Sequence, residues 1–263
     1  MKIPFNKESL KKELDLHNEF DQRFDNIANR YEQVTFGISN GSRFINRKEQ
    51  ELIISLLSNH LNSLRDRKIL DIGAGNGRWS KLFLTFGCEV YSLDNSSEMC
   101  RVLRQIHGLS VIQGDIQDIE LDEKFDLVFS MRALKYTNLS RVLANIRNLM
   151  NDKGILMFDV PNRLNPFYFT FYYLSLILIH FFRYNKYLKY SLISHLYTRS
   201  AAEKIISSLH YRVIERKSVF FFPDFIYLKI NSTVLLKLIT SIDRGLSKIL
   251  PRSLIFVVQK AKE

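Results

Sequence analysis

The stretch ILDIGAGNG, from Ile69 to Gly77, decides the fold class of this chain. A short apolar run leads directly into three glycines, and an amphipathic stretch over 78–86 predicts a helix after them. Glycine allows positive φ angles and lets a ligand approach the backbone, while the first turn of a helix offers free N–H donors. The stretch therefore predicts a ligand-binding turn between a strand and a helix, although a tight turn without a ligand is the alternative.

The spacing of the glycines separates two classes of nucleotide-binding loop. A dinucleotide loop reads G-x-G-x-x-G, which would place its third glycine at Arg78, whereas Gly77 comes one residue early. The pattern D-x-G-x-G-x-G instead resembles the loop of class I S-adenosylmethionine-dependent methyltransferases. This resemblance implies S-adenosyl-L-methionine as the cofactor and no metal. The residues of the loop that it implies as cofactor contacts are Asp71, Gly73, Ala74, Gly75 and Gly77.

Strands and helices are predicted to alternate along most of the chain. The predicted strands cover 68–72, 89–93, 109–113, 125–129, 155–158, 211–221 and 254–259. The predicted helices cover 8–30, 47–64, 78–86, 97–106, 139–150 and 198–209. Short apolar strands that alternate with helices are typical of a parallel sheet covered on both faces. We therefore expect an α/β protein with a doubly wound, mostly parallel, seven-stranded sheet, similar to the Rossmann-like methyltransferase fold.

The segments outside this alternation suggest four regions. We expect a helical N-terminal cap over 1–66, a cofactor-binding α/β core over 67–160, an aromatic and basic insert over 161–197, and completion of the sheet over 198–263. Residues 222–250 within the last region form a second apolar insert, which we expect to be helical.

Acidic residues follow the second and third predicted strands. Asp94 ends the second strand and is followed by Asn95, and a carboxylate in this place can accept hydrogen bonds from both ribose hydroxyls. The resemblance implies that Asp115 receives the adenine amine and that Ile116 lies against the adenine ring. Each aspartate alone is more often an ordinary strand-end residue, but the ordered set favours a cofactor site.

Two further segments resemble the same family. Ser130 and Met131 follow the fourth strand, where members of the family border the methionine end of the cofactor. Residues 24–32 resemble an F-D-x-x-A-x-x-Y-D/E element whose tyrosine covers the cofactor, so Tyr31 is the candidate for that role. A buried tyrosine at a helix end is the alternative.

The general base is unknown from the sequence. Methyl transfer from a sulfonium is an in-line displacement that mainly needs alignment, and a hydroxyl acceptor also needs a base. Candidates near the predicted sheet edge are Tyr136 and Asp159, and His195 is more simply an ordinary residue of the insert. The family's histidine is absent where Tyr136 stands.

The first insert suggests a membrane surface. It is rich in aromatic and basic residues and lacks Asp and Glu, and its apolar run Phe167–Phe182 is shorter than the roughly 20 residues of a spanning helix. We therefore expect peripheral contact through 167–190 rather than a crossing, with a soluble cap or dimer interface as the alternative. The N-terminus has no secretory h-region, so we expect a cytoplasmic protein at the inner face of the membrane.

Three functions compete. The aromatic inserts favour methylation of a small, lipophilic acceptor such as a quinone, a lipid or a lipid-linked saccharide. The net charge of +11 suggests methylation of RNA or another nucleic acid, but the residues after the fourth strand lack the [N/D/S]-P-P-[Y/F] motif of adenine-amine enzymes, so nucleic acid is the weaker hypothesis. A non-catalytic protein of the same fold is the third.

Overall fold

A mostly parallel sheet forms the centre of the molecule. The computed structural model describes residues 39–168, 170, 195–228 and 230–261. The strands are β1 (Lys68–Ile72), β2 (Glu89–Asp94), β3 (Leu109–Gln113), β4 (Phe125–Ser130), β5 (Met150–Pro161), β6 (Tyr211–Val219) and β7 (Ser253–Lys260). The helices are α2 (Asn40–His60), α3 (Arg78–Thr85), α4 (Ser97–Leu103), η3 (Leu134–Tyr136), α5 (Leu139–Leu149), α8 (Arg199–Ser208), α9 (Asp224–Leu228) and α10 (Thr233–Leu246).

The strand order is β3-β2-β1-β4-β5-β7-β6. Strands β1 to β5 pair in parallel, and β7 runs antiparallel to both of its neighbours. The prediction of a doubly wound, mostly parallel seven-stranded sheet is confirmed. Because β6 and β5 both oppose β7, the carboxyl ends of β1 to β6 meet at one edge of the sheet.

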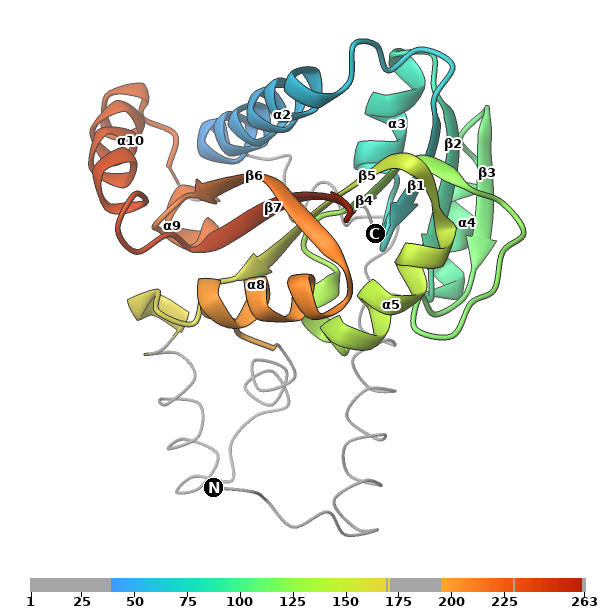
Figure 1. Cartoon of the computed structure of the whole chain (residues 1–263). Coiled ribbons are helices and arrows are strands. Elements are labelled where there is room, and N and C mark those ends of the chain that lie inside the picture. Colours follow the sequence, from blue (N-terminus) through green and yellow to red (C-terminus); the bar gives the residue numbers. More distant parts are fainter. Residues whose placement is uncertain (1–38, 169, 171–194, 229, 262–263) are drawn as a thin grey trace, which may run out of the picture.

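Two layers of helices cover this sheet, with α2 and α3 on one face and α5 and α8 on the other (Figure 1). Neighbouring strand residues point to opposite faces, so Ile69 packs with the first pair of helices and Leu70 with the second. Apolar residues of α2 such as Ile53 lie in the same core as β1, which joins this helix to the sheet.

The predicted helix over 47–64 is wrong at both ends, because α2 begins at Asn40 and ends at His60. Ser39 and Ser42 form a reciprocal capping box, which satisfies free N–H groups of the first turn. The amide of Gly41 donates to the carbonyl of Ile230 at 2.9 Å. This tertiary contact stabilises the first turn of α2, which the local sequence does not predict because it contains Gly41.

The predicted strand over 155–158 is too short, because β5 extends from Met150 to Pro161. Its second half pairs with β7 from Ile155 to Pro161, and this long-range pairing has no local sequence signal. The remaining predicted boundaries that fall on described residues differ by no more than one helical turn.

Helices α9 and α10 lie within residues 222–250, the expected second insert. This segment leaves the sheet at the end of β6, on the carboxyl edge, and a small core joins it to α2 through Ile45, Tyr227 and Leu236. The predicted helix over 8–30 and most of the first insert lie outside the described residues. Among the helices that the structure describes, none is long and apolar enough to cross a bilayer.

Candidate functional site

The glycine loop after β1 lies against the carboxyl end of β2. The amides of Gly73 and Ala74 both donate to the carbonyl of Leu93, at 2.8 and 3.1 Å. Gly73 and Gly75 have φ angles of +66° and +57°, which only glycine adopts without strain. A Cβ atom on Gly73 would lie 2.3 Å from that of Ala133, whereas one on Gly75 would meet no heavy atom within 4 Å. The backbone is therefore packed at Gly73 and open at Gly75.

Asp94 ends β2 beside this open backbone. Its Oδ2 accepts a hydrogen bond from the amide of Gly75 at 2.8 Å, and its Oδ1 accepts one from the amide of Ser96 at 3.0 Å. The residue is 8% exposed. These two bonds orient the carboxylate at the carboxyl end of β2, next to the turn of Gly75.

Asp71 lies beneath the loop, in the interior. Its Oδ2 accepts a 2.5 Å hydrogen bond from the Ser80 hydroxyl, which in turn accepts one from Ser92 at 2.8 Å. Burial raises the pKa of Asp71 to about 7, although the Ser80 hydrogen bond acts in the opposite direction. Asp71 of β1 is therefore buried and linked to α3 through Ser80 and to β2 through Ser92.

The residues after β3 extend the same edge. Asp115 is exposed, and its two carboxylate oxygens accept hydrogen bonds from the backbone amide (2.8 Å) and side-chain amide (3.1 Å) of Gln117. Ile116 is buried in the core next to α5, and Asn95 is exposed. The ends of β1, β2 and β3 thus bring Gly75, Asp94 and Asp115 to one edge of the sheet.

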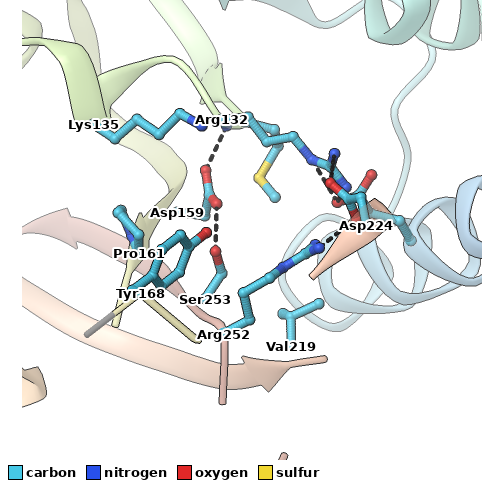
Figure 2. A pocket seen from close by; sticks show the side chains of 11 residues that line it. Arg132, Lys135, Asp159, Pro161, Tyr168, Val219, Asp224, Arg252 and Ser253 are labelled. Atoms are coloured by element: carbon cyan, nitrogen blue, oxygen red, sulfur yellow. Dashed lines mark hydrogen bonds and ion pairs between the residues drawn. The ribbon is translucent and has the colours of Figure 1, made fainter. Parts of the chain in front are cut away.

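The turn after β4 separates this half of the edge from a second half. The Ser130 hydroxyl is buried and donates to the carbonyl of Ile72 at 3.1 Å. Met131 lines a cavity of about 60 Å³ between the ends of β4, β5, β6 and β7 (Figure 2). The lining consists of Glu49, Met131, Arg132, Lys135, Asp159, Pro161, Tyr168, Val219, Asp224, Arg252 and Ser253.

A network of ion pairs forms one wall of this cavity. Glu49 of α2 accepts from Arg78 at 2.7 Å and from Arg132 at 2.9 Å. Arg132 also reaches Asp224 of α9 at 2.8 Å, and Asp224 pairs with Arg252 as well. Burial would raise the pKa values of Glu49 and Asp224, but the arginines hold both below their ordinary values. Both carboxylates are therefore ionised at neutral pH.

Arg132 also contacts Asp159, another residue of the cavity lining, through its backbone. Arg132 has a φ of +66°, an uncommon conformation for a residue with a side chain. Its amide donates to Asp159 Oδ1 at 2.5 Å, and the Ser253 hydroxyl donates to Asp159 Oδ2 at 3.1 Å. Burial raises the pKa of Asp159, while the amide and guanidinium of Arg132 partly oppose this shift. Strained backbone of this kind concentrates at functional sites.

Of the two candidates for a base, the described lining of the cavity includes Asp159 but not Tyr136. The Lys135 ammonium lies 4.7 Å from the centre of the Tyr136 ring. Burial disfavours the charged form of Lys135, yet the hydroxyls of Tyr136 and Tyr168 help to raise the pKa of Lys135 above its ordinary value. His195 is exposed, and its backbone amide donates to the carbonyl of Lys135 at 2.7 Å.

The charged wall was missed by the sequence analysis. Glu49, Arg132 and Asp224 come from α2, the turn after β4, and α9, and each pair is separated by more than 80 residues. Asp224 offered a weak signal, because it is one of two acidic residues in the apolar segment 222–250. Tyr31 lies outside the described residues. Within the described ranges, no three His, Cys, Asp or Glu side chains are placed to hold a metal ion.

Comparison with known proteins identifies a family that matches the first half of this sheet edge. Residues 70–158 match the family model described as a methyltransferase domain. This stretch is a class I S-adenosylmethionine-dependent methyltransferase domain. The prediction of this family from the glycine loop and the strand-end carboxylates is confirmed. The match begins in β1 and ends in β5, so the methyltransferase domain as matched excludes α2 and the second insert.

Curated relatives of this methyltransferase domain are distant. A ubiquinone biosynthesis O-methyltransferase of Pasteurella multocida (strain Pm70) is 29% identical over 130 residues, which cover 43% of this chain and 53% of that protein. The chain thus spans about half the length of this relative. A ubiquinone biosynthesis O-methyltransferase of Rickettsia bellii (strain OSU 85-389) is 24% identical over 204 residues, covering 71% of this chain and 85% of the relative.

The fold of the methyltransferase domain extends beyond the matched residues. The magnesium protoporphyrin IX methyltransferase of Synechocystis PCC 6803, crystallised with SAH, superposes with a TM-score of 0.63 at 13% identity. The superposition covers 93% of this chain and 100% of that one. At 13% identity, the similarity between the two proteins is one of fold.

Proposed function

We propose that this protein is an enzyme that transfers a methyl group from S-adenosyl-L-methionine to a small, lipophilic acceptor. The observation that carries the proposal is the division of one sheet edge into two adjoining parts. An open glycine turn with a strand-end carboxylate lies over β1 to β3, and a charged cavity lies over β4 to β7.

The residues over β1 to β3 fit the proposed donor. The open backbone at Gly75 leaves room for a ligand, and the adjacent Asp94 carboxylate suits a pair of ribose hydroxyls. Asp115 is exposed and offers an acceptor for the adenine amine, with Ile116 beside it. Tyr31 stays our candidate for covering the donor. In this proposal Asp71 acts indirectly, through Ser80 and the loop.

Ser130 and Met131 would border the methionine end of the donor, and Asn95 the ribose. Met131 also lines the cavity, so the sulfonium would lie where the two halves of the edge meet. When bound, the donor supplies an electrophilic methyl group. The chain's own task is then to align the acceptor oxygen with it and to exclude water.

Asp159 is our candidate for the group that receives the proton of a hydroxyl acceptor. It lines the cavity, and its raised pKa brings it closer to that of an effective base at neutral pH. The amide of Arg132 and the hydroxyl of Ser253 fix its two oxygens. Lys135, which stays charged, would stabilise an acceptor oxygen as it loses its proton.

Relatives named for ubiquinone biosynthesis support a phenolic acceptor with an apolar tail. The charged lining of the cavity suits the hydroxylated ring of such an acceptor. Its apolar tail would then contact the apolar inserts. Peripheral membrane contact through 167–190, at the inner face of the membrane, belongs to this proposal. That range is largely outside the described residues.

The test is transfer of a labelled methyl group from S-adenosyl-L-methionine to catechols with and without a prenyl tail. We expect product only from the prenylated compounds and a fall in kcat of about 100-fold for Asp159→Asn. The matched control is Asp118→Asn, which changes an exposed carboxylate and should leave kcat unchanged.

Equal turnover of tailed and tail-free catechols would contradict a lipophilic acceptor. Unchanged kcat in Asp159→Asn would contradict the role of that carboxylate. No labelled product from any catechol would contradict a phenolic acceptor.

A further inference from the structure

Helix α10 presents an apolar stripe to the solvent. Val234, Leu238, Ile242 and Ile249 are 76%, 58%, 46% and 76% exposed. Val234, Leu238 and Ile242 are spaced four residues apart, which places them on one side of α10, and Ile249 lies in the turn that follows the helix. Leu235 and Leu246 are also exposed. Large apolar side chains that gather on one exposed face mark a binding surface more often than chance exposure.

The opposite side of α10 is fixed to the protein. Asp243 is buried and accepts a 2.6 Å hydrogen bond from the Tyr227 hydroxyl and bonds from the amides of Phe221 (2.8 Å) and Phe222 (3.0 Å). Leu236 packs in the small core with Ile45 of α2. The stripe is therefore carried on an anchored helix and is not the core-facing side of the helix.

The charges around the stripe identify its partner. Lys237, Arg244 and Lys248 are exposed on or next to α10. Asp243 is the single acidic residue between positions 231 and 250, and it is turned inward. The outer face thus combines apolar and cationic side chains without an exposed carboxylate. An anionic lipid surface is complementary to both kinds of side chain. The apolar ones can be buried at the boundary of the headgroups, and each basic residue adds about 1 kcal/mol near such a surface.

A second copy of the chain fits this face less well. Two-fold association places the same patch on both partners, which would bring two sets of cations together without an exposed acid of the 231–250 segment to separate them. The surface therefore favours lipid over self-association.

We propose that α10 docks the protein on an anionic bilayer, with the Val234–Ile249 stripe inserted at the level of the headgroups. Helix α9 connects this surface to the cavity, because Asp224 lines the cavity and Tyr227 holds Asp243 of α10. The use of such docking, to bring a lipid-dissolved acceptor to the cavity, rests on the proposed function, whereas the docking itself does not.

The test is sedimentation of the full-length protein with vesicles of pure phosphatidylcholine and with vesicles in which one lipid in three is phosphatidylglycerol. We expect binding only to the anionic vesicles, falling as salt is added. The double variant Leu238→Ser/Ile242→Ser should bind at least about tenfold more weakly, because it loses two apolar side chains that would insert into the bilayer. Lys237→Gln/Lys248→Gln should lose about fivefold for each charge.

The matched control is Phe86→Ser, which removes an exposed apolar side chain after α3, at the amino edge of the sheet. It should bind vesicles like the wild type. Thermal melting checks that each variant is folded, and calorimetry of S-adenosyl-L-methionine checks the donor site separately. Failure of donor binding with intact vesicle binding would refute the proposed function and leave the docking proposal standing.

Three results would overturn the docking proposal. The first is absence of wild-type binding to anionic vesicles. The second is vesicle binding that both α10 double variants retain in full, which would place the contact elsewhere. The third is a wild-type dimer in sedimentation velocity that Leu238→Ser/Ile242→Ser converts to a monomer, which would make the stripe an interface between copies.

Discussion

The two halves of the carboxyl edge are built in different ways. Over β1 to β3 the site consists largely of backbone, with a glycine turn that is open at Gly75 and two carboxylates, Asp94 and Asp115, that accept hydrogen bonds from amides. Over β4 to β7 it consists of side chains, with charged groups from α2, the turn after β4, α9 and the turn before β7. The first half thus depends mainly on backbone geometry, whereas the second depends on particular side chains, which in the proposed function would select the acceptor.

The largest loss of stability is expected from a substitution in the side-chain half. Arg132→Ala should lower the free energy of unfolding by about 3–5 kcal/mol, because it leaves Glu49 and Asp224 without the cation that they share. The measurement is urea denaturation followed by circular dichroism. Arg141→Ala is the control, since its pair with Asp118 is exposed and should contribute less than about 1 kcal/mol. Equal losses in both variants would contradict the stabilising role of the buried ion pairs of Arg132.

The backbone half should show its main pH dependence through Asp71. Its pKa is raised in the folded state to about 7, so the folded protein holds a proton that the unfolded chain releases at lower pH. Wild-type stability should therefore fall, relative to Asp71→Asn, by about 3 kcal/mol as the pH rises from about 5 to about 8. Parallel stability curves for the two proteins over this range would show that burial does not perturb this carboxyl.

Alanine variants of Gly73 and Gly75 distinguish the glycine that is needed for packing from the glycine that leaves room for a ligand. Gly73→Ala should cost about 2–3 kcal/mol of stability, because its Cβ would collide with Ala133 in addition to the backbone strain. Gly75→Ala should cost only about 1 kcal/mol but weaken donor binding by about tenfold or more, because its Cβ occupies the open side of the loop. Thermal melts and calorimetry measure the two quantities. Unchanged donor affinity in folded Gly75→Ala would mean that the open side is not used.

The smallest effect is expected at Tyr136, which is not part of the described cavity lining. Tyr136→Phe should change kcat by less than about twofold, in contrast to Asp159→Asn, because its hydroxyl would not receive the acceptor's proton. The comparison uses the same labelled-methyl assay. A loss in Tyr136→Phe as large as that in Asp159→Asn would move the base from β5 to the turn after β4.

The arrangement of elements in the backbone half could be predicted from the sequence because its signals are local. The order of strand, glycines and helix, followed by Asp94 and Asp115 after the next two strands, lies within 50 residues. Parallel strands then bring these groups to the same edge without further information.

The side-chain half could not be predicted in the same way. The contacts of Arg132 with Glu49 and Asp224 join segments separated by 83 and 92 residues, and none of the three belongs to a local motif. The early start of α2 has a similar cause, since the contact of Gly41 with Ile230 depends on how the second insert folds back.

The most direct test of the central claim is calorimetric titration of S-adenosyl-L-methionine and S-adenosylhomocysteine into wild type, Asp94→Asn and Asp159→Asn. Asp94→Asn keeps an oxygen for the amide of Gly75 but loses the charge that would bind the ribose, so affinity should fall by about 10- to 100-fold. Asp159→Asn, on the acceptor side, should bind like the wild type. No binding to folded wild type, or equal binding by wild type and Asp94→Asn, would contradict the assignment of the glycine half to the methyl donor.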